Sequence, residues 1–381
     1  MNGYEKIKEA ARLRAAEASK NGRDIAPLPE VVNPKRKKYA QTHFRYFCEQ
    51  YFAALFTMKW SDDHLKVIAK IEQAVLHGGL FALAMPRGSG KSTLAECAAV
   101  WAMLYGHREF VALIGATESA ALELLEKIKI KIETNQLLME DFPEVCYPIK
   151  KLDGIANRCA GQTCNGERTR IGWTASEIIL PTIEGSAASG AIVRVAGITG
   201  RVRGMACQRP DGRMVRPSLV IVDDPQTADS ANSVEQTRKR IRILSADILG
   251  LAGPGQKISG IMPCTVIRAG DMADQILDRE THPDWNGERT KLIYKLPLNE
   301  ALWDQYADVR ADSLRKFGDI REATAFYRKN RKAMDEGADI AWPARHEPDE
   351  LSAIQNAMNL KIKDEAAFMA EYQNDPLNED D

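Results

Sequence analysis

The sequence predicts an α/β fold with a mostly parallel central sheet, followed by a mainly helical part. Two observations support this fold class. Short apolar runs alternate with helical segments, a pattern typical of parallel strands whose connecting helices cover the faces of a sheet. After residue 297 the apolar runs fade and polar helical segments dominate. We therefore expect three parts: residues 1–40, residues 41–296 and residues 297–381.

Residues 1–40 are expected to form an N-terminal helical and basic arm. Residues 4–20 are rich in alanine and polar side chains, which favours a helix, and a group of prolines beginning at Pro27 ends that pattern. The consecutive bases at 35–38 make the arm basic. The arm is either a docking segment for a partner protein or a disordered tail, and the sequence leaves both alternatives open.

Residues 41–296 are expected to form the core of the fold. Helices are predicted at 42–56 and within 61–79, where Ser61 is the expected N-cap and two glycines end the pattern. Apolar runs with strand character follow at 80–85, 110–114, 192–196, 219–222 and 257–262.

Composition and charge exclude several classes of protein. The formal net charge is −1 at pH 7, so nucleic-acid binding cannot rest on an overall basic charge. No apolar run approaches the ~20 residues that span a bilayer, and the amino terminus lacks the apolar core of a signal peptide. The seven cysteines are an odd number scattered through the chain, which favours reduced thiols. We expect a cytoplasmic protein without a membrane segment.

The stretch FALAMPRGSGKST at 81–93 combines a strand-like run, a glycine-containing turn and a helix start. It matches in part the pattern G-x-x-x-x-G-K-[ST], in which Gly90 lets the backbone approach nucleotide phosphates, Lys91 reaches the β- and γ-phosphates and Ser92 ligates Mg²⁺. Met85 replaces the first glycine, and the alternative is a chance turn before a helix. The expected nucleotide-binding residues are Pro86, Arg87, Gly88, Ser89, Gly90, Lys91, Ser92 and Thr93.

Two acids follow the apolar strand in the stretch SLVIVDDP. Asp223 emerges at the carboxyl end of that strand, where open α/β sheets bind ligands, and it is expected to hold the metal together with Ser92. Asp224 occupies the position where many ATPases have a glutamate that activates the attacking water. Because aspartate is one methylene shorter, either the water sits closer, or a second water relays the proton, or another acid takes this role.

A third polar position follows the strand predicted at 257–262. The apolar run in KISGIMPCTVIRAGD ends at Thr265, whose hydroxyl is expected to sense the γ-phosphate; the alternative is a threonine that merely finishes a strand. The long separation between Lys91 and Asp223 requires extra strands, and the absence of an N-K-x-D tetrapeptide argues against a GTPase. We therefore predict a P-loop NTPase fold with an additional strand between the Walker A and Walker B motifs, plus a helical lid or linker.

These motifs, in this order, resemble the ATPase part of the large terminase subunits of tailed bacteriophages. The resemblance runs from about residue 23 to the end and rests on MPRGSGKST, FVALIGATESA, GITGRVRGM, RPSLVIVDDPQ, GIMPCTVIRAGDMADQIL, AWPARHEPDEL and FMAEYQNDP. Terminases similar to this chain carry a deviant phosphate loop that begins with Pro-Arg, which accounts for Met85 and Arg87. In that family EYQNDP leads into a nuclease domain. The chain ends seven residues after Asn374, so nuclease activity is not expected from it.

The resemblance implies an ATP-hydrolysing motor that moves double-stranded viral DNA into a preformed capsid, with ATP and Mg²⁺ as cofactors. Thr265 is then the residue that couples hydrolysis to movement, and Arg87 points into the phosphate site. Such motors need a positive charge in the transition state, an arginine finger. The candidates are Arg87 within the subunit, or Arg201 or Arg203 in GRVRG. This pair is equally well explained by contacts to DNA phosphates or by a solvated loop. The implied catalytic residues are Asp224, Arg87, Thr265, Arg201 and Arg203, and the implied metal ligands are Ser92 and Asp223.

The resemblance also implies partners. These are double-stranded DNA, bound through sequence-independent backbone contacts, the portal protein, the small terminase subunit, and further copies of the chain in a ring of five. The expected location is the host cytoplasm, with transient docking at the procapsid portal. Two alternatives remain: another DNA-dependent ATPase such as a helicase or remodeller, and an inactive nucleotide-binding adaptor.

Two further features have ordinary structural interpretations. Trp60 is expected to be a core or interface aromatic, with adenine stacking as the alternative. Asp271, Asp274 and Asp278 lie on one predicted helix face, and we attribute them to helix capping and a solvated face rather than to a metal cluster.

Overall fold

The structure is a computed structural model, and it describes residues 23–377. The helix predicted at 4–20 lies outside the described residues.

The core is a mixed α/β fold built around one large, mostly parallel sheet. In the described part of the chain this sheet has eight strands in the order β12-β1-β11-β10-β2-β7-β6-β5, and only β6 runs antiparallel to its neighbours. The five predicted strands are confirmed as β1 (Leu80–Ala84), β2 (Phe110–Gly115), β7 (Ile192–Gly197), β10 (Leu219–Asp223) and β11 (Ser259–Cys264). The short outer strands are β5 (Gly172–Trp173), β6 (Glu177–Ile179) and β12 (Glu288–Arg289).

Strand β11 lies between β1 and β10, although it follows both of them in the chain. Its pairing with β1 continues to Ala84↔Cys264, whereas its pairing with β10 stops at Ile221↔Ile261. Pro263 has no N–H to donate, which is consistent with the early end of the second ladder. Because the three strands are parallel, their carboxyl ends meet at the same edge of the sheet.

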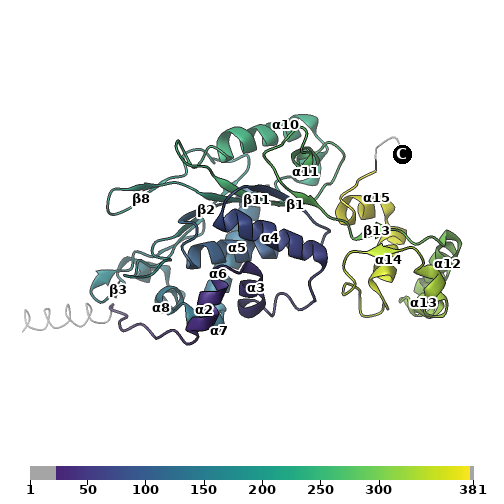
Figure 1. The fold of residues 1–381 in the computed structure, drawn as a ribbon, viewed down its shortest axis with the longest axis horizontal. Coiled ribbons are helices and arrows are strands. Elements are labelled where there is room, and N and C mark those ends of the chain that lie inside the picture. The colour runs from purple at the N-terminus through teal and green to yellow at the C-terminus, as the bar shows by residue number, and fades with distance from the viewer. Residues whose placement is uncertain (1–22, 378–381) are drawn as a thin grey trace, which may run out of the picture.

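Helices cover both faces of the sheet (Figure 1). One face packs on α3 (Phe44–Tyr51), α4 (Asp62–Leu76), α5 (Lys91–Leu104) and α6 (Glu118–Thr134). The other face packs on α10 (Val234–Ile243), η2 (Leu244–Ile248) and α11 (Met272–Leu277). Alternate residues of each strand enter the two buried clusters, as the period of a strand requires. Ser61 caps α4, as predicted, by accepting a hydrogen bond from the backbone N–H of His64. The helix predicted at 42–56 is shorter, because Phe52 leaves the helical region.

Smaller elements complete the core. They are α2 (Pro34–Ala40), α7 (Gln136–Asp141), α8 (Pro143–Lys150), η1 (Ala156–Ala160), β3 (Thr163–Cys164), β4 (Glu167–Arg168), β8 (Cys207–Gln208), β9 (Met214–Val215) and α9 (Ala228–Ala231).

The last part of the described chain lies to one side of the sheet (Figure 1). We call residues 293–377 the C-terminal helical unit; it contains β13 (Ile293–Lys295), α12 (Glu300–Phe317), α13 (Arg321–Met334), β14 (Asp339–Ile340), α14 (Ala353–Lys363), α15 (Glu365–Ala367) and η3 (Phe368–Tyr372). Trp303, Tyr306 and Tyr327 form the centre of its own buried cluster. The predicted helical character is confirmed, but the pairing of β13 with β14 was not predicted, because so short a strand shows no apolar alternation. The boundaries at 40 and 297 stay a prediction.

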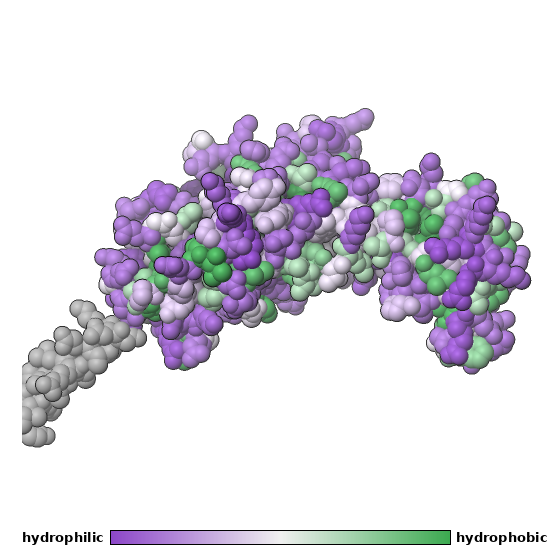
Figure 2. Space-filling view, turned by 60° about the horizontal axis from the view of Figure 1, so that its bottom comes forward, coloured by the Kyte–Doolittle hydropathy of each residue, from purple (hydrophilic) through white to green (hydrophobic). Residues whose placement is uncertain are grey.

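Hydrophilic residues predominate on the face shown in Figure 2, and the hydrophobic residues there form small, separate patches. Within the described residues, no helix combines the length and the apolar character that crossing a bilayer requires. All seven cysteines are free thiols.

Candidate functional site

The turn between β1 and α5 presents the first backbone N–H groups of α5. Gly90, the N-cap of α5, has φ = +82°, a left-handed conformation that favours glycine. A Cβ placed on Gly90 would meet no atom within 4 Å, so the space in front of the turn is open. No described side chain caps α5, so its N-terminal N–H groups are free to donate hydrogen bonds to an anion.

The first two residues of α5 contact the carboxyl ends of two neighbouring strands. Lys91 Nζ donates to Thr265 Oγ1 at 2.9 Å and lies 3.7 Å from Asp224 Oδ2. Ser92 Oγ donates to Asp223 Oδ1 at 2.8 Å. The structure thus brings together five side chains from three separate stretches of sequence, at the edge where β1, β11 and β10 end. They are Lys91, Ser92, Asp223, Asp224 and Thr265.

The two acids sit close together in a partly desolvated position. Burial, and secondly the nearby Asp224 charge, raise the pKa of Asp223 to about 6. The Asp224 side chain keeps 46% of its surface accessible at the mouth of the site, but the surrounding protein still desolvates it and raises its pKa. Asp224 also has φ = +38° and donates its N–H to the Pro263 carbonyl at 2.9 Å. A non-glycine residue in this conformation is strained, which is a common feature of functional sites.

The side chains of Ser92 and Asp223 fit a magnesium ion. Mg²⁺ prefers oxygen ligands and is usually held by one or two carboxylates together with substrate phosphates and water. A hydroxyl and a carboxylate 2.8 Å apart, beside an uncapped helix N-terminus, match that requirement. No group of three or more His, Cys, Asp or Glu within residues 23–377 is arranged to hold a metal by itself.

The side chain of Arg87 is bound to the C-terminal helical unit. Its Nη1 donates to Glu371 Oε2 at 2.6 Å, and its backbone N–H donates to the Glu371 carbonyl at 2.8 Å. The Arg87 side chain is 68% exposed. In this conformation its guanidinium belongs to a surface ion pair, whereas the sequence predicted that it would point into the phosphate site.

Arg201 and Arg203 both lie on the exposed loop after β7. Arg203 pairs with Asp247 of η2, with Nη2 and Oδ1 2.6 Å apart, and its side chain is 78% exposed. Among the described residues, no hydrogen bond or ion pair joins either arginine to the five side chains around Lys91.

A cavity of about 400 Å³ opens beside the turn that precedes α5. It is lined by residues 88–90 of the turn, by Phe56 and Trp60, and by residues of the loop after β14. His64 connects these parts: its Nε2 lies 3.0 Å from the Ser89 carbonyl, and its ring contacts Trp342 edge-on. Trp60 lines the cavity while donating its Nε1–H to Glu49, so both alternatives for Trp60 remain compatible with its position.

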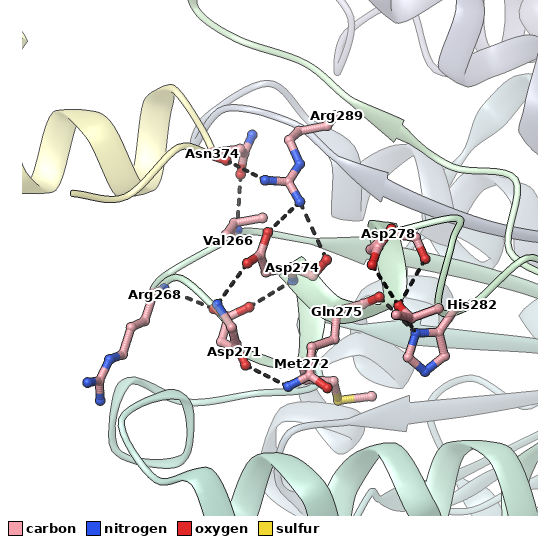
Figure 3. A network of polar contacts seen from close by, with 12 residues as sticks. Val266, Arg268, Asp271, Met272, Asp274, Gln275, Asp278, His282, Arg289 and Asn374 are labelled. Carbon is pink, nitrogen blue, oxygen red and sulfur yellow. Dashed lines mark hydrogen bonds and ion pairs between the residues drawn. The ribbon is translucent and has the colours of Figure 1, made fainter. Parts of the chain in front are cut away.

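Residues 371–375, which we call the clamp segment, tie the C-terminal helical unit to the candidate site. Asn374 is fully buried; its Oδ1 accepts from the Val266 N–H at 3.1 Å and its Nδ2 donates to the Thr290 carbonyl at 2.9 Å. Figure 3 shows Asn374 beside Val266 and Arg289. Since Val266 directly follows Thr265, the clamp segment contacts the end of β11 as well as the turn at Arg87. The sequence singled out EYQNDP only through the family resemblance and missed this contact.

The acids after β11 have structural roles. Asp271 is the N-cap of α11 and is 1% exposed, and its Oδ2 also accepts from Gln226 and from the N–H groups of Ile267 and Arg268. Asp274 pairs with Arg289 across the network in Figure 3, and Asp278 ends α11 and accepts from Thr281. The predicted capping role is confirmed for Asp271.

An Asn374→Ala variant is expected to lose about 2–4 kcal/mol of unfolding free energy, because it leaves the Val266 N–H and the Thr290 carbonyl buried without partners. Asn374 has φ = +50°, so Asn374→Gly, which tolerates that conformation, isolates the hydrogen-bond loss from backbone strain. The measurement is urea unfolding. Lys291→Ala, which removes the more exposed pair with Asp375, is the control and should cost at most about 1 kcal/mol. Equal losses for Asn374→Gly and the control would contradict this role.

The comparisons with known proteins gave few matches. No family model matches the chain, and no curated protein matches its sequence. Among solved structures, the chain is similar to the large terminase ATPase domain of Thermus phage P74-26. A mutant of that domain aligns with 86% of this chain and 98% of its own length at 12% identity and a TM-score of 0.37. The unmodified domain aligns with 73% of this chain and 97% of its own length at 13% identity and a TM-score of 0.31.

Proposed function

We propose that the chain binds and hydrolyses ATP with Mg²⁺, and that hydrolysis drives movement along double-stranded DNA. The observation that supports the first part is the convergence of the α5 N-terminus with the ends of β10 and β11. The contacts of Ser92 with Asp223 at 2.8 Å and of Lys91 with Thr265 at 2.9 Å join residues that lie far apart in the sequence. Such a lysine, hydroxyl and carboxylate set beside an uncapped helix N-terminus is suited to a nucleoside triphosphate.

In this proposal each side chain has a distinct task. The N–H groups of the turn and Lys91 bind the phosphates, and Ser92 and Asp223 would hold Mg²⁺, which neutralises phosphate charge when it is bound. Asp224 orients the attacking water and accepts its proton, a task for which a raised pKa is favourable. Thr265, whose hydroxyl contacts both Lys91 and Asp224, reports the phosphate state to Val266 and so to the clamp segment.

The DNA part of the proposal rests on the terminase resemblance of the sequence. The motor would move viral DNA through the portal of an empty capsid in the host cytoplasm, as a ring of five subunits assisted by a small terminase subunit. Because the net charge is −1, each subunit would contribute few phosphate contacts, and the ring would add them up. Arg87, Arg201 and Arg203 remain the candidates for the arginine finger.

The test is the rate of ATP hydrolysis by the full chain, with and without duplex DNA. We expect Mg²⁺-dependent hydrolysis that rises with duplex DNA, and a DNA affinity that falls steeply between about 50 and about 200 mM salt. We also expect no strand displacement on a forked duplex. Strand separation would favour the helicase alternative, and calorimetry without any heat of nucleotide binding would overturn the proposal.

A further inference from the structure

Two buried polar atoms without partners belong to residues that line the cavity beside the turn that precedes α5. Ser89 Oγ and Arg345 Nη1 are both buried, and neither has a hydrogen-bond partner among the described residues. Ser89 belongs to the turn itself and is 6% exposed. Arg345 comes from the loop after β14, in the C-terminal helical unit, and both residues line the same cavity. Buried polar groups are almost always paired, so two unpaired atoms on neighbouring sides of one turn are unusual for a protein interior.

The guanidinium of Arg345 is held against the turn. It lies over the ring of Tyr372, with Cζ 5.3 Å from the ring centroid, and a Cβ placed on Gly88 would be 3.5 Å from its Nη2. Trp342, three residues earlier in the same loop, donates its Nε1–H to the Lys59 carbonyl at 2.7 Å. The hydrogen bond of Trp342 fixes this loop to the core. The Arg345 guanidinium is thus held beside Tyr372 and Gly88 without an ion pair that neutralises its charge.

The two acids that act on the Arg345 charge are Glu347, which lines the same cavity, and Glu350. Glu350 accepts from Asn359 through Oε1 and from the Glu347 N–H through Oε2. No carboxylate of the described residues lies within ion-pair distance of Arg345. Burial lowers the pKa of Arg345 below its ordinary value, although the charges of Tyr372, Glu347 and Glu350 act in the opposite direction. A buried cation without a counter-ion is costly, and an anionic ligand in the cavity would remove that cost.

We propose that Arg345 is a further nucleotide-binding residue, which contacts the phosphate chain from the C-terminal helical unit, opposite the N–H groups of the turn. This inference rests on the proposed function, because it takes the anion to be the nucleotide. Its consequence is mechanical. A nucleotide bound between the turn and Arg345 bridges the core and the C-terminal helical unit, and the clamp segment joins the same two parts through Glu371 and Asn374.

The test measures binding of ADP and of adenosine to the full chain by calorimetry. Arg345→Ala and Arg345→Gln should weaken ADP binding by about 10- to 100-fold, as expected for one charge-assisted contact, and should change adenosine binding little. Arg310→Ala is the matched control, because Arg310 is another arginine of this unit with a buried Nε that has no partner, and it lies outside the cavity. The control should bind both ligands as the unaltered chain does.

A second measurement does not depend on any variant. In the unaltered chain, ADP should protect Arg345 from modification by phenylglyoxal, read by mass spectrometry, and adenosine should not. If the unaltered chain binds ADP but Arg345 is not protected, or if both Arg345 variants bind ADP normally, this inference fails and the proposed function stands. Equal weakening of ADP and adenosine binding would also overturn it. If the unaltered chain binds no nucleotide, the proposed function fails, and this inference fails with it.

Discussion

Replacement of Lys91 by alanine is expected to lower ATP hydrolysis by about 100- to 1000-fold, the loss typical of removing one preorganised group that stabilises developing charge. The Lys91 side chain is only 11% exposed and lies between Thr265 Oγ1 and Asp224 Oδ2. The ion pairs of the described residues provide no other cation for Asp224. The variant therefore loses both the positive charge that binds the phosphates and the cation that lowers the pKa of Asp224 against the effect of burial.

The control for this change is Lys66→Ala. Lys66 lies on α4, is 59% exposed and pairs only with Asp63, 3.5 Å away, among the described residues. Steady-state hydrolysis and circular dichroism should show an unaltered rate for Lys66→Ala and a native fold for both variants. A folded Lys91→Ala variant that hydrolyses ATP at the normal rate would mean that the turn before α5 does not hold the reacting phosphates.

Asp223→Asn is expected to abolish most activity and, at the same time, to stabilise the fold. Activity should fall by at least about 100-fold, because the change removes a carboxylate from the set that would hold Mg²⁺. Removing a residue that only orients a metal ligand already lowers activity by about 10- to 100-fold. The amide keeps an oxygen that can accept the hydrogen bond from Ser92. It carries no charge, so the desolvation of the carboxylate and its repulsion from Asp224 are both relieved.

The pH dependence follows from the raised pKa. Burial raises the pKa of Asp223 from 3.8 to about 6, so between these values the unfolded chain loses this proton while the folded chain keeps it. Stability therefore falls as pH rises through this window, and the cost reaches up to about 3 kcal/mol above pH ~6. Asp223→Asn should thus raise Tm at pH 8 in the absence of Mg²⁺ and nucleotide, and should not raise it at pH 3.5.

Thermal unfolding at the two pH values, without Mg²⁺, is the measurement. Adding Mg²⁺ with ADP should stabilise the unaltered chain much more than the variant, because the variant binds the ion poorly. Ser92→Ala is a useful companion variant, since it removes the other proposed ligand without removing a buried charge. An Asp223→Asn variant that is no more stable at pH 8 than the unaltered chain would contradict the desolvation argument.

Much of the core could be predicted from local sequence patterns. The apolar runs at 80–85, 219–222 and 257–262 predicted parallel strands, and parallel strands carry their end residues to one edge of the sheet. That rule predicts that Lys91, Asp223 and Thr265 lie together, and the structure brings them together. Ser61 was likewise predicted as a helix cap, because capping depends on residues only three positions apart.

The sequence by itself therefore determined the five main strands of the sheet, the order of the motifs and the residues at the sheet edge, since these depend on periodicity and on neighbours along the chain. Only the tertiary structure decided that Arg87 pairs with Glu371, that Asn374 binds beside Thr265, and that Arg345 faces Gly88. Each of these contacts joins residues more than 100 positions apart, across separately packed hydrophobic clusters. Their geometry is set by how the C-terminal helical unit docks on the core, and no local pattern of charge or hydrophobicity encodes that docking.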